Sequence, residues 1–186
     1  MKEQYVYIML VRTNTVLSRL IHFFTGDSYT HSAIGVDDCE GAFYGFGRRW
    51  KYWPFLGCFH KEYPWMFKHV VPCRIYRISV SNESYNSLVK LLGNMYEDRD
   101  SYHYNFAGVV ALWLGMSKPS RRNHHFFCSQ FVIWALKQTG CVTEEFKPEE
   151  FRPSSFCTLP CAKLIYEGIP SRSRVICRGI SATAYK

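Results

Sequence analysis

The sequence has no run of apolar residues long enough to cross a membrane, and its first residues lack the apolar core and small-residue cleavage site of a secretory signal. It also has no long block of consecutive basic residues, although 23 Lys and Arg against 15 Asp and Glu give a formal net charge of +8. These absences predict a cytoplasmic protein that does not bind nucleic acid. The positive charge leaves peripheral contact with anionic surfaces open.

The chain also lacks the close pairs of ligands that a structural zinc site needs. Its eight cysteines are scattered, Cys58 and His60 are too close together for the usual zinc loop, and the pair Cys157 and Cys161 has no second pair. Because no export signal precedes them, we expect free thiols rather than disulfides. Neither a metal ion nor another cofactor is expected.

What the chain does contain is a large supply of core-forming residues. Hydrophobic residues make up 47% of its 186 positions and aromatic residues 17%, which is sufficient for one folded domain over residues 1–186. Alternating and helical patterns predict strands at 5–11, 29–36, 42–50, 73–80, 162–168 and 173–179, and helices at 13–26, 82–96, 104–115 and 127–139. Strands and helices fall in blocks, so we expect an α+β fold with a largely antiparallel sheet.

Two of the predicted helices and one aromatic segment carry further expectations. The helix at 13–26 has apolar residues at helical spacing, and Gly26 suits its end. The helix at 104–115 is nearly all apolar, so we expect it to be buried. Residues 51–71 are rich in aromatic residues and contain Pro54 and Pro64, which predicts a long insertion loop that forms one wall of a cleft.

Cys128 is the cysteine whose position most favours chemistry, because it follows a polar loop and opens a strong helical pattern. The first turn of a helix has unpaired N–H groups and a partial positive charge, which together favour a thiolate and stabilise an oxyanion. A cysteine that only packs in the core is the ordinary alternative, since free Cys is among the most buried residue types. Among the other cysteines, Cys73 and Cys177 lie in predicted strands, Cys39 lies in a turn, and Cys141 follows the end of a helix.

A nucleophilic cysteine needs a base, usually histidine. His31 stands at the start of a predicted strand, where its side chain can point into a cleft while the rest of the strand is buried. A hydrogen-bonded histidine in the core or at its rim is the alternative interpretation. His124 and His125 are adjacent in an exposed loop, so their side chains diverge. His22 lies in a predicted helix, and His60 and His69 lie in the aromatic segment.

The stretch "YTHSAIGV" followed much later by "FFCSQFVIWAL" resembles the circularly permuted branch of the NlpC-type papain-like proteins, which includes the YiiX-like and LRAT-like groups. In that branch the histidine strand precedes the cysteine helix, as it does here. The resemblance implies a permuted papain-like fold, in which an antiparallel sheet packs against the helix that carries the nucleophilic cysteine. It is clearest over residues 5–50 and 104–140.

The same resemblance implies an enzyme, a cysteine hydrolase or acyltransferase that acts on an amide or ester. Cys128 would be the nucleophile and His31 the base, with an acyl thioester as intermediate. Members of this kind cleave amides, including peptidoglycan peptides, or move acyl chains between lipids. We therefore expect a small-molecule, lipid or peptide substrate, in a cleft lined partly by residues 51–71.

The third residue of the family's site falls near Gly45, which has no side chain to orient an imidazole. Tyr44 is predicted as the third member, although neighbouring strand residues face opposite sides and Tyr44 needs a register shift or bulge to point correctly. Asp37, Glu40 and Glu62 are further candidates that are no better placed. The alternative function is a weakly active or inactive module that binds a lipid, glycan or peptide on the same fold.

Overall fold

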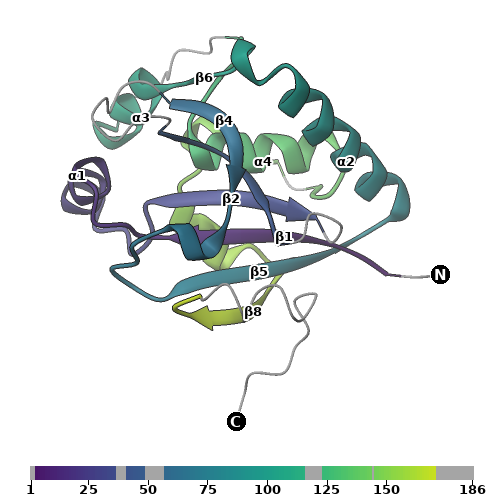
Figure 1. Ribbon diagram of the computed structural model, residues 1–186, viewed down its shortest axis with the longest axis horizontal. Helices are drawn as coiled ribbons and strands as arrows, with labels where there is room; N and C mark the ends of the chain where they lie inside the picture. Colours follow the sequence, from purple (N-terminus) through teal and green to yellow (C-terminus); the bar gives the residue numbers. More distant parts are fainter. Residues whose placement is uncertain (1–2, 37–40, 49–56, 116–122, 144, 171–186) are drawn as a thin grey trace.

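The structure is a computed structural model that describes residues 3–36, 41–48, 57–115, 123–143 and 145–170 (Figure 1). These residues form an eight-stranded sheet in the order β7-β6-β4-β3-β2-β1-β5-β8, in which every neighbouring pair is antiparallel except β6 and β7. The strands are β1 (Gln4–Val11), β2 (His31–Val36), β3 (Phe43–Arg48), β4 (Gly57–Glu62), β5 (Cys73–Val80), β6 (His103–Tyr104), β7 (His125–Phe126) and β8 (Ala162–Gly168). The expected α+β class and the largely antiparallel sheet are confirmed.

The helices are α1 (Val16–Thr25), α2 (Asn82–Glu97), α3 (Phe106–Trp113) and α4 (Cys128–Gln138), with short 3-10 turns at 64–66, 99–101, 148–150 and 153–158. Their ends follow the sequence signals. Thr15 caps α1 by accepting a hydrogen bond from the Ser18 amide, and Gly26 ends α1 in the left-handed region at φ 69°. Ser81 caps α2 in the same way.

Successive side chains of a strand point to opposite faces of the sheet. Both faces of this sheet carry buried apolar residues. On one face, side chains such as Ile8, Ile34 and Phe46 pack against α2 and α4. On the other face, Met9 and Phe43 belong to a second apolar cluster. Figure 1 shows α2 and α4 across the sheet, with α1 and α3 together beyond the strand ends. No helix in the described part of the chain is both long enough and apolar enough to span a membrane.

The interpretation of residues 51–71 as a long loop is wrong for residues 57–62, whereas 63–71 contain only the short 3-10 turn at 64–66 and otherwise neither helix nor strand. Residues 57–62 form β4, which pairs with both β3 and β6. Only Phe59 of this strand is fully buried in the core, while Cys58 and His60 alternate with it on the other face. One core residue with polar neighbours is a weak strand signal. Residues 51–56 and the predicted strand at 173–179 lie outside the described residues.

The expectation that the apolar helix at 104–115 is buried is also wrong. In α3 only Gly108 and Val109 are buried, and Leu114 directly after it is 66% exposed. Val16, Leu20 and Phe24 of α1 are exposed as well, whereas Ile21 and Ser18 face inward and the Ser18 hydroxyl lies 2.6 Å from that of Thr30. Composition alone therefore did not determine which face of these two helices meets the core.

Candidate active site

His31 is the first residue of β2, and its side chain is 16% exposed. The preceding residues Tyr29 and Thr30 are buried, and the Thr30 amide donates to the Val11 carbonyl, so the strand enters the sheet with His31 at its open end. The His31 Nε2 lies 2.7 Å from Oε2 of Glu62, the last residue of β4. Glu62 is only 3% exposed, so this ion pair is largely shielded from water.

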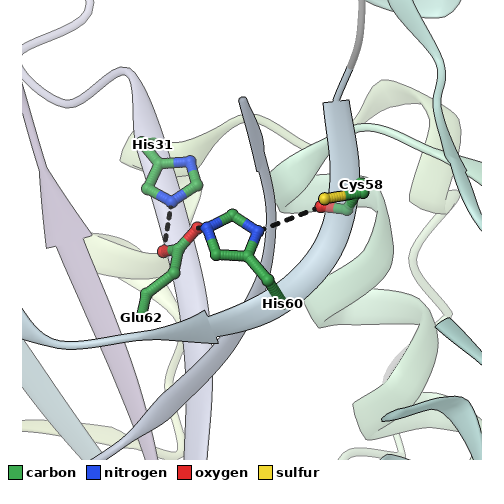
Figure 2. A network of polar contacts seen from close by, with 4 residues as sticks. All are labelled: His31, Cys58, His60 and Glu62. Atoms are coloured by element: carbon green, nitrogen blue, oxygen red, sulfur yellow. Dashed lines mark hydrogen bonds and ion pairs between the residues drawn. The ribbon is translucent and has the colours of Figure 1, made fainter. Parts of the chain in front are cut away.

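The Glu62 side chain lies across β3, the strand between β2 and β4, and Figure 2 shows its carboxylate beneath the His31 ring. Two glycines of β3 give it room. A Cβ at Gly45 would lie 3.2 Å from Glu62 Oε1, and a Cβ at Gly47 would lie 2.7 Å from the same oxygen. Glycine at these two positions is thus what allows a carboxylate on β4 to reach a histidine on β2.

His60 binds the same carboxylate from the other side (Figure 2). Its Nε2 lies 3.3 Å from Glu62 Oε1, and its Nδ1 lies 3.1 Å from the Cys58 carbonyl oxygen, to which it donates. Burial lowers the pKa of His60, but its contacts with Cys58 and the charge of Glu62 outweigh burial and raise it. Glu62 is therefore held between two imidazole rings.

Cys128 is the first residue of α4 and is 5% exposed. The helix start is held by Gln130, whose side-chain oxygen accepts a hydrogen bond from the Phe127 amide at 3.3 Å. The amides of the first helical turn have no partner within the helix, so α4 presents donors beside the thiol. Cys128 thus stands in the first turn of a helix, as the sequence predicts, where a thiolate is favoured.

The Cys128 side chain raises the pKa of His31 through a hydrogen bond and through its charge, so the thiol lies beside the His31 ring. Because the Glu62 carboxylate occupies Nε2, Nδ1 is the ring nitrogen left for the thiol. Burial lowers the pKa of His31, but the charge of Glu62 and the hydrogen bonds with Cys128 and Glu62 outweigh burial and raise it well above 6.5. The environment of His31 therefore favours an imidazolium between two groups that carry or can acquire negative charge.

A pocket of about 370 Å³ opens beside His31, and His60, Glu62 and Phe67 contribute to its lining. A second pocket contains Cys128 and adjoins the first, since both include the same three residues, Ile21, Thr30 and Tyr104. The pocket that contains the thiol is small, about 20 Å³, and shares a wall with the larger pocket that His31 lines. Within the segment 51–71, which is expected to line a cleft, the described residues His60, Glu62 and Phe67 line this pocket.

Tyr44 is not the third member of the site, contrary to the prediction. Its ring lies in the core on the helix-covered face of the sheet, stacked on Phe59 at 5.9 Å and edge-on to Tyr96 at 6.0 Å. The β3–β4 register runs without interruption from Phe43 to Arg48, so no bulge turns Tyr44 to the other face. The residue that contacts His31 Nε2 is Glu62.

Glu62 is one of the further candidates that the sequence offers, within the segment 51–71 that is expected to be a loop. A strand reading of 57–62 would have placed Cys58, His60 and Glu62 on one face, with Phe59 opposite. Three alternate strand residues that all carry reactive or polar groups are typical of a functional site rather than of an apolar core. That alternation was the signal available in the sequence.

The structure describes four of the remaining candidates, Cys73, Cys141, His124 and His125. Burial raises the pKa of the Cys73 thiol to about 12 and raises that of Cys141, so both are poor nucleophiles. His125 is the first residue of β7 and His124 precedes it, and the Nδ1 of His125 lies 2.9 Å from the Asn123 carbonyl oxygen. Cys39, Asp37, Glu40 and Cys177 lie outside the described residues.

Within the described ranges, no three His, Cys, Asp or Glu side chains are arranged to hold a metal ion. No protein-family model matches the chain, and a search among curated proteins found no match.

Proposed function

We propose that the protein is a thiol-dependent hydrolase or acyltransferase that acts on an amide or ester, with a circularly permuted papain-like fold of the NlpC type. The observation that carries the proposal is the chain of contacts from Cys128 through His31 to Glu62. A nucleophile, a base and a group that orients the base are the three parts that covalent acyl transfer requires.

The first step is attack by the Cys128 sulfur on the substrate carbonyl carbon, with the thiol proton held on His31. The carbonyl π electrons move to oxygen, and the amides of the first turn of α4 donate to that oxyanion. When the carbonyl re-forms, the bond to the leaving amine or alcohol breaks, and His31 returns its proton to that group. An acyl thioester on Cys128 remains.

The second step returns the enzyme to its starting state. His31 removes a proton from water, or from another acceptor with a hydroxyl or amine, as that acceptor attacks the thioester carbonyl. The C–S bond breaks, the acid or new ester or amide leaves, and Cys128 regains its thiol proton. Hydrolysis and acyl transfer differ only in this acceptor.

Glu62 acts as a positioning residue in both steps. Its contact at 2.7 Å fixes the plane of the His31 ring, and its charge favours the imidazolium that each step passes through. The order of the site along the chain, with the histidine strand before the cysteine helix, supports the permuted topology. The packing of α4 against β2 and β3 supports the same assignment.

The second candidate is a module that binds a lipid, glycan or peptide without catalysis. Gly45 has no side chain to orient the His31 ring, which favours this candidate. The Glu62 carboxylate, which lies beside Gly45, weakens that argument because it contacts His31. What still favours this candidate is a cleft with apolar and aromatic walls, including Phe46, Phe67 and Tyr104.

The test is reaction with p-nitrophenyl esters followed by mass spectrometry of the intact protein. We expect a burst of nitrophenol and a mass increase of one acyl group at Cys128, both lost in Cys128→Ala and in His31→Gln. Cys161 is exposed and serves as the matched control thiol, so Cys161→Ala should leave the burst unchanged. Acylation of Cys161 with Cys128 unmodified would favour the binding module instead.

A further inference from the structure

Helix α1 exposes more large apolar residues than an ordinary surface helix does. Its apolar residues Val16, Leu20, Phe23 and Phe24 follow a helical stripe that faces solvent, with Phe23 80% exposed and Val16 67% exposed. Its inner side carries the two buried residues Ile21 and Ser18, and the Ser18 hydroxyl lies 2.6 Å from that of Thr30. The fold of the described chain therefore leaves the apolar stripe of α1 uncovered.

The stripe continues onto α3, which lies beside α1 in Figure 1. Phe24 stacks on Trp113 with the ring centroids 6.5 Å apart, and Leu114 at the end of α3 is 66% exposed. We call these residues the α1–α3 apolar surface: Val16, Leu20, Phe23, Phe24, Trp113 and Leu114. Neighbouring exposed residues of this size and number on one surface indicate a binding face.

Cations accompany this surface. Arg19 is exposed on α1, and the Arg12 guanidinium lies 3.1 Å from the His22 ring of the same helix. Lys68 is exposed on the segment that the Thr13–His69 bridge ties to the start of α1. Asp27, just after α1, is the acidic residue nearest to the stripe in sequence. Aromatic and aliphatic side chains flanked by Arg and Lys are typical of a helix that lies in a lipid interface.

We propose that the α1–α3 apolar surface docks onto an anionic lipid bilayer. Charge complementarity favours this partner over a second copy of the chain, because two copies would bring their Arg12, Arg19 and Lys68 side chains together and each chain carries a net charge of +8. A bilayer surface with anionic headgroups accepts both the apolar and the basic residues.

The docking surface is continuous with the cleft. Leu17, Ser18 and Ile21, on the inner side of α1, line the pocket that contains His31. Docking through α1 therefore brings the cleft of the site close to the level of the headgroups. The proposal goes beyond the proposed chemistry and does not depend on it, although Trp113 of this surface also lines the pocket that contains Cys128.

The experiment is co-sedimentation of the full chain with vesicles of phosphatidylcholine alone and of phosphatidylcholine mixed with an equal part of phosphatidylglycerol. We expect binding to the mixed vesicles that weakens as salt is raised. Phe23→Ser should weaken that binding by about tenfold or more, since it removes a large apolar side chain from the interface. Arg19→Gln should weaken it less and reduce the salt dependence.

Ile169→Ser is the matched control, because Ile169 is 70% exposed but follows β8 and is not part of the surface. It should bind like the unaltered protein, and so should Cys128→Ala, which separates this proposal from the proposed chemistry. Circular dichroism confirms that each variant is folded. Equal binding to both vesicle types, or unchanged binding of Phe23→Ser, would overturn the proposal. Dimers that Phe23→Ser disperses would assign the surface to a second copy and overturn it as well.

Discussion

Glu62 reaches His31 across an intervening strand, with 2.7 Å between Oε2 and Nε2. The partners lie on β4 and β2, and β3 runs between them. The carboxylate is buried at 3% exposure, so its charge acts on the imidazole with little screening by water. The pKa of His31 therefore depends on a residue two strands away.

Glu62→Gln removes the charge but keeps the shape of the side chain. We expect kcat for ester hydrolysis to fall by about 10²-fold or more, within the range seen for general acid–base groups. The pKa of His31 should fall in the same variant, because the charge of Glu62 is the largest influence that raises it. Rates with p-nitrophenyl esters and a histidine NMR titration measure the two effects.

The matched control for that variant is Glu167→Gln. Glu167 also pairs with a cation, Arg74, at 3.1 Å, but on β8 and β5 at the far edge of the sheet from β4. Its rate and its His31 titration should equal those of the unaltered protein. A Glu62→Gln enzyme with normal kcat would remove Glu62 from the mechanism.

Gly47→Ala tests whether the β3 glycines make room for Glu62. The new Cβ would lie 2.7 Å from both Glu62 Oε1 and His60 Cε1, which is closer than nonbonded atoms allow. The carboxylate has to move, so we expect a loss of activity of about tenfold or more, in line with the sensitivity of catalysis to small misplacements. Gly45→Ala, with contacts of 3.1–3.2 Å, should lose less.

Gly93→Ala is the control for a glycine without neighbours. It lies in α2 and a Cβ there would meet nothing within 4 Å. Helix propensity predicts a stability gain of about 0.5–1 kcal/mol with unchanged activity. Urea unfolding and ester hydrolysis of the three variants give the comparison, and equal activities in Gly47→Ala and Gly93→Ala would show that the β3 glycines do not hold the site open.

The pH dependence of stability should carry the signature of His31. Its folded-state pKa is raised well above 6.5, so the folded protein binds this proton more tightly than the unfolded chain does. The resulting stabilisation is fully present below the unfolded pKa near 6.5, and it is lost as the pH rises through the raised folded pKa. Urea unfolding across this window should show the free energy of unfolding declining with pH.

Glu62→Gln should flatten that decline, because it removes the main cause of the raised pKa. His22→Gln is the comparison variant, since His22 lies on the exposed helix α1 and contacts neither Glu62 nor Cys128. A decline that persists unchanged in Glu62→Gln would assign the pH dependence to another group.

The strand and helix boundaries were predictable wherever local patterns were strong. The clean alternation of 73–80 and the caps of α1 and α2 are local features, and the structure has them. His31 and Cys128 were also identifiable, because each stands at the start of an element with a distinct pattern. Their role in catalysis stays a prediction.

What could not be predicted depends on contacts between distant segments. The orienting group required knowing that 57–62 is a strand and that it pairs with β3 in a register that brings Glu62 beside Gly45 and Gly47. Likewise, the periodicity of α1 predicts a helix but does not say which side faces the core. The inward contact of Ser18 with Thr30 decides that orientation, and it joins two elements.

Tyr44→Phe tests whether Tyr44 rather than Glu62 orients His31. The Tyr44 ring is held in the core between Phe59 and Tyr96, with the Lys61 ammonium 5.5 Å from its centroid. Phenylalanine keeps this packing, so we expect kcat within about twofold of the unaltered protein and a stability cost of about 1 kcal/mol or less from the lost hydroxyl. Ester hydrolysis and urea unfolding, run beside Glu62→Gln, measure both. A large fall in kcat for Tyr44→Phe, with normal kcat for Glu62→Gln, would reverse the assignment and return Tyr44 to the site.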